Sequence, residues 1–187
     1  MKKLFYLIFV IIFLSGNINL WATDIDVGAP CIDRTDSFST SYTWVEKSNP
    51  SNATGTIDHI DIWFWFLGGT IDVGSFYVVS GDNLSTRDIA EGISVNSGDN
   101  DLDAPGDFTA FDINAGDYIG GNDRPIERDY SGIEGVWYVS GDKIPCTDQA
   151  FSFYSSYMIS IYATGTTGAP PPAPAKVAPD ILIFQEQ

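Results

Sequence analysis

Apolar and polar residues alternate along several short segments of the chain, and turn-forming residues separate these segments. The longest alternation covers residues 57–67. Successive side chains of a β-strand point to opposite faces of the sheet, so this pattern predicts a strand with one apolar face in the core. The residues of that face are Ile60, Ile62, Phe64 and Phe66.

Similar but shorter strand signals recur between clusters of Gly, Asn, Asp and Ser, and no helical period appears after residue 22. The Gly68–Gly69 pair predicts a hairpin between the long strand and residues 70–73. The predicted strands number about ten, which is typical of an all-β, jelly-roll-like antiparallel β-sandwich. They cover residues 41–45, 57–67, 70–73, 75–79, 89–95, 108–113, 118–119, 136–139, 150–153 and 158–163.

The composition agrees with short strands joined by acidic turns. The chain has 187 residues, with 20 Asp against 5 Glu, 18 Gly and 26 aromatic residues. Asp favours turns and caps, whereas Glu suits helix interiors, so the excess of Asp argues against a helical bundle. The net charge of -16 excludes nucleic acid as an expected partner, because the basic surface that binds phosphates is missing.

The N-terminus has the pattern of a secretory signal peptide over residues 1–22. Lys2 and Lys3 precede an apolar run of 11 residues, 4–14, which is too short to cross a bilayer of about 30 Å as a helix. We therefore expect a secreted protein, extracellular or periplasmic, that does not span a membrane after cleavage. An uncleaved N-terminal anchor is the alternative.

The rest of the chain divides into three parts. Residues 23–168 form the predicted β-sandwich domain. Residues 169–179 hold five of the ten prolines and predict an extended linker. Residues 180–187 resume an apolar, strand-like run, which is either a tail or the start of a truncated second module.

Two cysteines, Cys31 and Cys146, are present. An even number of cysteines in an exported chain predicts a disulfide between them, and two buried free thiols are the alternative. A zinc site is not expected, because two Cys and one His do not complete a tetrahedral set without carboxylates.

Motifs for catalysis are missing from the sequence. His59 is the single histidine, and no nucleophile elbow or phosphate-binding loop occurs. The surroundings of His59, Ile57-Asp58-His59-Ile60-Asp61, are typical of an ordinary strand position. We therefore expect a protein that is not an enzyme, with a glycan-active enzyme as the least favoured hypothesis.

The second face of the strand at residues 57–67 is the main candidate for ligand binding. It carries His59, Asp61, Trp63 and Trp65. If this face is exposed, the two tryptophans predict an aromatic platform that stacks on sugar rings beside hydrogen-bonding groups. The alternative is that both faces are buried, as large aromatic residues mostly are. Trp137 and Tyr138 allow the same two interpretations.

An acidic segment over residues 99–107, predicted as a loop, is the main candidate for a metal site. Alternate carboxylates in this region suit a hard cation such as Ca²⁺. The segment departs from the EF-hand pattern, because Ala104 replaces the glycine and Ala110 replaces the glutamate. A solvated loop without metal is the alternative. The predicted ligands are Asp99, Asp101, Asp103 and Asp107.

Three motifs in the second half of the chain carry a resemblance to known proteins. They are residues 116–120 (Gly-Asp-Tyr-Ile-Gly), 135–138 (Gly-Val-Trp-Tyr) and 140–147 (Ser-Gly-Asp-Lys-Ile-Pro-Cys-Thr). They resemble a β-sandwich module that recurs in uncharacterised secreted and surface-associated proteins. The resemblance covers about residues 24–165. It implies a fold and a surface context, and it transfers no active site.

These features together predict a non-catalytic binding module at the cell exterior, with a polysaccharide or cell-surface glycan as ligand. A structural surface, appendage or adhesin module without a small ligand is the alternative.

Overall fold

The computed structural model describes residues 24–168 except 123 and 131–133. Within this part of the chain the structure has fifteen strands and no helix, and all its strand pairs are antiparallel. The all-β antiparallel prediction is therefore confirmed. The jelly-roll connectivity stays a prediction. The described residues contain no helix long and apolar enough to cross a membrane.

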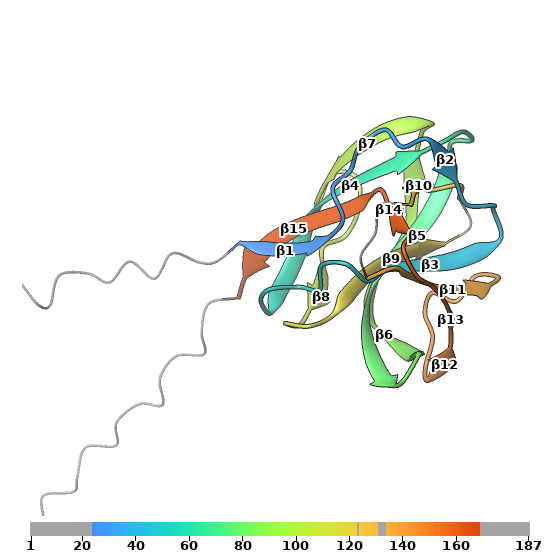
Figure 1. Cartoon of the computed structure of the whole chain (residues 1–187). Coiled ribbons are helices and arrows are strands. Elements are labelled where there is room, and N and C mark those ends of the chain that lie inside the picture. The colour runs from blue at the N-terminus through green and yellow to red at the C-terminus, as the bar shows by residue number, and fades with distance from the viewer. Residues whose placement is uncertain (1–23, 123, 131–133, 169–187) are drawn as a thin grey trace, which may run out of the picture.

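The first of two large sheets has five strands and contains both ends of the described chain. Its first and last strands pair side by side, with Ile25 opposite Gly165, so the chain enters and leaves at one edge of the fold (Figure 1). The strand order is β1 (Ile25–Gly28), β15 (Ile161–Thr167), β4 (Gly55–Phe64) and β7 (Gly98–Asp103), with β8 (Phe111–Ile113) also paired to β4.

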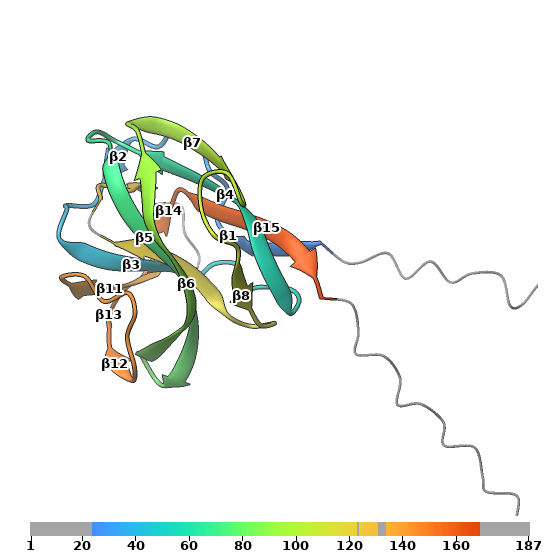
Figure 2. The ribbon, with the colours of Figure 1, turned by 180° about the vertical axis from the view of Figure 1, so that it is seen from behind.

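The second large sheet has seven strands and is built around a long hairpin that stands out in both views (Figure 2). Its order is β12 (Gln149–Ala150), β6 (Asn83–Val95), β5 (Gly69–Ser80), β9 (Tyr118–Asn122), β3 (Tyr42–Glu46), β11 (Val136–Ser140) and β13 (Ser152–Tyr154). A small third sheet has the order β14 (Met158–Ile159), β10 (Glu127–Asp129) and β2 (Asp36–Ser37).

The main core lies where residues of the two large sheets meet. Ile60, Ile62 and Phe64 of β4 are fully buried and share one cluster with Ile71 of β5 and Ile119 of β9. Burying a side chain of this size contributes roughly 1.5–3 kcal/mol. The apolar stripe predicted from alternation therefore forms the core, except at its last member.

The predicted strand at residues 57–67 ends early, at Phe64. Phe66 lies beyond it and is exposed, so its assignment to the core is wrong. The predicted hairpin at Gly68–Gly69 is also wrong. β4 pairs with β15, β7 and β8, whereas β5 pairs with β6 and β9. The connection crosses between sheets, and Leu67 adopts a positive φ of 65° there.

Two further segments differ from the sequence prediction. The strands predicted at 70–73 and 75–79 form one strand, β5, because Gly74 pairs with Ile89 on one side and Gly120 on the other. The acidic segment predicted as a loop overlaps β7, which pairs with β4 over six residues.

Cys31 and Cys146 are free thiols, so the predicted disulfide is wrong. Cys31 Sγ lies 3.6 Å from Asp99 Oδ1, on β7 of the five-stranded sheet. The Cys146 backbone N–H donates to Thr86 Oγ1 at 2.9 Å, on β6 of the seven-stranded sheet. The two thiols pack against different sheets, whereas a disulfide needs Cα atoms within about 7 Å of each other. The predicted signal peptide (1–22), linker (169–179) and tail (180–187) lie outside the described residues.

Candidate functional site

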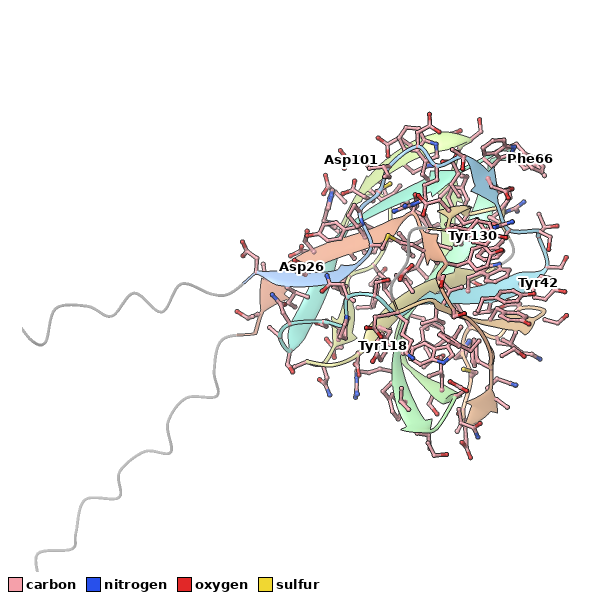
Figure 3. The ribbon with its side chains drawn as sticks, viewed as in Figure 1. Asp26, Tyr42, Phe66, Asp101, Tyr118 and Tyr130 are labelled. Atoms are coloured by element: carbon pink, nitrogen blue, oxygen red, sulfur yellow. The ribbon has the colours of Figure 1, made fainter. Side chains whose placement is uncertain are left out.

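Strand pairing brings the predicted ligand residues of β4 and the predicted metal ligands of β7 onto one face. His59 stands opposite Asp103, and Asp61 stands opposite Asp101. Directly opposite residues of an antiparallel pair, and residues two apart on one strand, share a face. The sequence analysis predicted a ligand site and a separate metal site. In the structure the residues of both lie on one face. We call this set the acidic face; Asp101 marks its position in Figure 3.

His59 is held between carboxylates on the acidic face. Its Nδ1 lies 2.9 Å from Asp103 Oδ1 and 3.6 Å from Asp101 Oδ1, and its Nε2 lies 3.2 Å from Asp61 Oδ2. Partial burial lowers the pKa of His59, but the hydrogen bonds with Asp103 and Asp61 outweigh this effect and raise the pKa overall. The neighbouring carboxylates therefore stabilise the protonated form of the imidazole relative to that of a free histidine.

The calcium prediction placed its ligands in a loop, and this placement is wrong for three of the four. Asp99, Asp101 and Asp103 lie on a regular strand, and the carboxylate of Asp107 accepts a hydrogen bond from the Asp103 backbone N–H at 3.0 Å. Among the described residues, the set that can reach one metal ion is His59, Asp61 and Asp101, whose ligand atoms lie within 4.8 Å of one another. Calcium binding itself stays a prediction.

Cys31 borders the acidic face but is a poor nucleophile. Burial raises the pKa of its thiol well above the usual range, and the negative charges of Asp99 and Asp61 raise it further. The reactive form of cysteine is the thiolate, so this environment keeps the side chain inert.

Trp63 and Trp65 lie in different environments. Trp63 is half-buried on β4 and hydrogen-bonds to the carboxyl group of Glu127. Trp65 lies beyond the end of β4, is 47% exposed, and neighbours the exposed Phe66 and Leu67. The predicted two-tryptophan platform on one strand face is therefore wrong in its geometry, because the strand ends between the two residues.

Trp137 is a core residue. It is 2% exposed, its Nε1 donates to Asp82 Oδ1 at 2.8 Å, and Tyr118 packs edge-on against its ring at 4.9 Å. It offers no surface to a ligand, so its candidacy for ligand binding is wrong. Tyr138 is half-buried and belongs to a second site, which the sequence did not predict as a unit.

This second site is a groove of about 280 Å³ whose walls are mostly aromatic. Small-molecule sites typically measure about 300–1,000 Å³, so the groove suits a single small ring better than a large ligand. We call it the aromatic groove. Tyr42 marks its position in Figure 3, far from Asp101 of the acidic face. It is lined by Ser37, Phe38, Ser39, Tyr42, Trp44, Arg128, Tyr138, Tyr154 and Tyr157.

Four rings of the groove lie nearly parallel. Phe38 stacks on Trp44 with centroids 3.7 Å apart and planes 9° apart, and Tyr138 stacks on Tyr154 at 4.3 Å and 11°. Trp44 and Tyr138 connect the two pairs at 5.3 Å. The register causes this arrangement, because Trp44 of β3 stands opposite Tyr138 of β11, and β13 pairs with β11 next to it.

Arg128 of β10 contributes the charged side chain of the groove. Its guanidinium carbon lies 4.6 Å from the centroid of Phe38 and 4.7 Å from that of Tyr157, within the range of cation–π contacts. Its Nε donates to the Ser37 carbonyl oxygen at 3.2 Å, and its Nη2 lies 2.7 Å from Asp36 Oδ2. Stacking and pairing together fix the guanidinium in place.

Two buried nitrogen donors of groove residues, Trp44 Nε1 and Arg128 Nη1, have no hydrogen-bond partner among the described residues. Leaving a buried donor unpaired costs about 1–3 kcal/mol. Such groups are uncommon in stable folds and often mark a functional site.

Of the residues that line the groove, the sequence analysis named only Tyr138 as a candidate for ligand binding. The available signal was weak: Tyr42 and Trp44 occupy alternate positions of a predicted strand, and Tyr154 and Tyr157 follow another. Only the observed pairing of β3, β11 and β13 reveals that these rings share a face.

A wider depression of about 570 Å³ lies between β1 and the acidic face. Its lining includes Asp26, Cys31, Asp61 and Tyr162. Burial and the charge of Asp26 raise the pKa of Tyr162. With one aromatic side chain and two carboxylates, this depression offers less ring surface than the aromatic groove.

Comparison with family models, with curated proteins and with solved structures gave no match to this chain. The resemblance to a secreted β-sandwich module therefore stays a prediction, and the functional case rests on geometry.

Proposed function

We propose that this protein is a non-catalytic carbohydrate-binding module of the cell exterior and that the aromatic groove is its binding surface. The observation that carries the proposal is the set of nearly parallel rings lining one groove beside hydrogen-bonding groups. A sugar ring has an apolar face of C–H groups and a rim of hydroxyls. Its recognition therefore needs flat aromatic surface together with polar partners.

The accessibility of the groove residues supports this role. Tyr154 is 41% exposed, and Tyr138 and Tyr157 are half-buried, so ligand can reach parts of these side chains. Trp44 is buried, and it stacks on Phe38 and on Tyr138. A rigid inner layer that supports an accessible outer layer limits the entropy lost on binding.

The chemistry of the lining favours binding over hydrolysis. No Asp or Glu is among the described residues that line the groove. Glycosidases generally need two carboxyl groups on either side of the bond that they cleave. Glu46, the carboxylate of β3, is fully buried and accepts a hydrogen bond from the Ile159 backbone N–H at 2.8 Å.

Affinity electrophoresis on a panel of neutral and acidic polysaccharides tests the proposal. We expect at least one polysaccharide to retard the protein, and Tyr154→Ala and Tyr138→Ala to weaken binding roughly tenfold or more, as loss of a central aromatic contact does. Trp65→Ala is the matched control, because it removes an exposed aromatic side chain that does not line the groove.

Two outcomes would overturn the proposal. One is a lack of retardation by every polysaccharide, which would favour the structural surface module. The other is loss of binding in Trp65→Ala with normal binding in Tyr154→Ala, which would move the site to the connection between β4 and β5.

A further inference from the structure

The charge of the aromatic groove depends on Arg128. Among the described residues that line the groove, Arg128 is the one with a charged side chain. An arginine in a sugar-binding groove would ordinarily favour acidic sugars, because a guanidinium pairs strongly with a carboxylate.

In this protein the charge of Arg128 is already balanced. Arg128 of β10 stands directly opposite Asp36 of β2, and the two side chains form an ion pair of 2.7 Å. The side chain of Arg128 is 15% exposed, and that of Asp36 is 56% exposed. Strand register places the two residues directly opposite each other, which favours this contact between their side chains.

The guanidinium of Arg128 is largely committed to contacts within the protein. Its Nε is used by the Ser37 carbonyl, its Nη2 faces Asp36, and its plane lies over Phe38 and Tyr157. Nη1 is buried and has no hydrogen-bond partner among the described residues. A neutral sugar can approach the exposed 15% of the Arg128 side chain without bringing a second negative charge next to Asp36.

The charge of the whole chain acts in the same direction. A net charge of -16 repels an anionic polymer at long range, and Asp36 repels a ligand carboxylate at short range. We infer that the aromatic groove selects uncharged saccharides over acidic ones and that Asp36 determines this selectivity by neutralising Arg128. This inference rests on the proposed carbohydrate-binding function.

The test compares a neutral glucan with the same glucan oxidised to the uronate at C6, because this pair differs by the carboxylate alone. If the neutral glucan is not a ligand, the neutral polymer retained most strongly in the panel takes its place, with its C6-oxidised form. We expect the wild-type protein to bind the neutral polymer at least tenfold more tightly, with little dependence on NaCl concentration.

Asp36→Asn should reduce this preference roughly tenfold, because it leaves Arg128 free to pair with the ligand carboxylate. The gain in binding to the oxidised polymer should fall as salt is added, since salt screens the new ion pair. Arg128→Gln introduced into Asp36→Asn should abolish the gain.

Two control variants separate this effect from general changes in charge or folding. Asp112→Asn removes the same charge from an exposed residue of β8 that does not line the groove, and it should leave the preference unchanged. Asp36→Glu keeps the charge beside Arg128 and should keep the preference for the neutral polymer.

The outcomes distinguish this inference from the proposed function. Equal wild-type binding of the two polymers, or an unchanged preference in Asp36→Asn, would overturn the inference while sugar binding that depends on Tyr154 still stands. Absence of binding to any polymer would overturn the proposed function and the inference together.

Discussion

The indole Nε1 of Trp137 donates a 2.8 Å hydrogen bond to the carboxylate of Asp82, which joins β11 to the turn between β5 and β6. Trp137 is buried, so this bond satisfies a donor that water cannot reach. An aspartate of a turn therefore also stabilises the core. The same contact explains why Trp137 does not face a ligand.

Asp82→Ala should lower the free energy of unfolding by about 1–3 kcal/mol, because it leaves the indole N–H buried without an acceptor. Asp82→Asn should cost less, since its amide oxygen can accept the same bond. Urea denaturation followed by tryptophan fluorescence measures both. Equal stability of Asp82→Ala and the wild type would contradict this role of the bond.

We expect the buried carboxyl group of Glu46 to make the stability of the protein depend on pH. Its carboxyl group is buried, and burial raises its pKa although hydrogen bonds donated by Ile159, Ser48 and Lys47 oppose the shift. A raised pKa means that the folded protein holds this proton more tightly than the unfolded chain. The contribution of this group to stability is therefore fully present below about pH 4.3, the usual pKa of Glu, and is lost as pH rises through the folded-state pKa.

Glu46→Gln should remove this part of the pH dependence. The free energy of unfolding of the variant, relative to that of the wild type, should be higher at neutral pH than at about pH 4. Urea titrations at each pH measure this difference. Glu91→Gln is the control, because Glu91 lies exposed on β6. The prediction fails if Glu46→Gln and Glu91→Gln follow the same pH profile.

The inward face of β4 could be predicted from the sequence because the signal is local. Ile60, Ile62 and Phe64 alternate with polar residues, and a period of two needs no knowledge of the partner strand. The end of the strand could not be predicted in the same way. Trp65 and Phe66 continue the apolar pattern, but the chain leaves the sheet there to cross to the other one.

The strand β7 was missed because aspartate is unfavourable in strands and favourable in turns. Pairing with β4 overrides this preference, and it buries Asn100 and Leu102 between the exposed aspartates. The aromatic groove was missed for a related reason. Its residues come from β2, β3, β10, β11 and β13 and the segments that flank them, and only the register of these strands brings the side chains together.

The free thiols predict that reducing agents have no effect on stability. The melting temperature should be the same with and without dithiothreitol, and thiol titration of the unfolded protein should give two thiols per chain. Cys31 should react slowly in the folded protein, because burial and the nearby carboxylates raise the pKa of its thiol. A melting temperature that falls on reduction would indicate a disulfide and contradict the structure.

His59 offers the last test, since it is the single histidine and its ring protons give an unambiguous NMR titration. Hydrogen bonds with Asp103 and Asp61 outweigh the effect of burial and should raise its pKa above the usual value of about 6.5. The stabilisation that His59 provides is therefore fully present below about pH 6.5 and is lost as pH rises through the folded-state pKa. The pairs are partly exposed, so the effect should not exceed about 1 kcal/mol.

Asp103→Asn should lower the pKa of His59, because it removes the closest carboxylate, 2.9 Å from Nδ1. Asp112→Asn is the control for a general loss of charge, and it should leave this pKa nearly unchanged because Asp112 lies on β8 rather than on the acidic face. A wild-type pKa at or below 6.5, or equal shifts in the two variants, would show that β4–β7 pairing does not hold His59 between the carboxylates in solution.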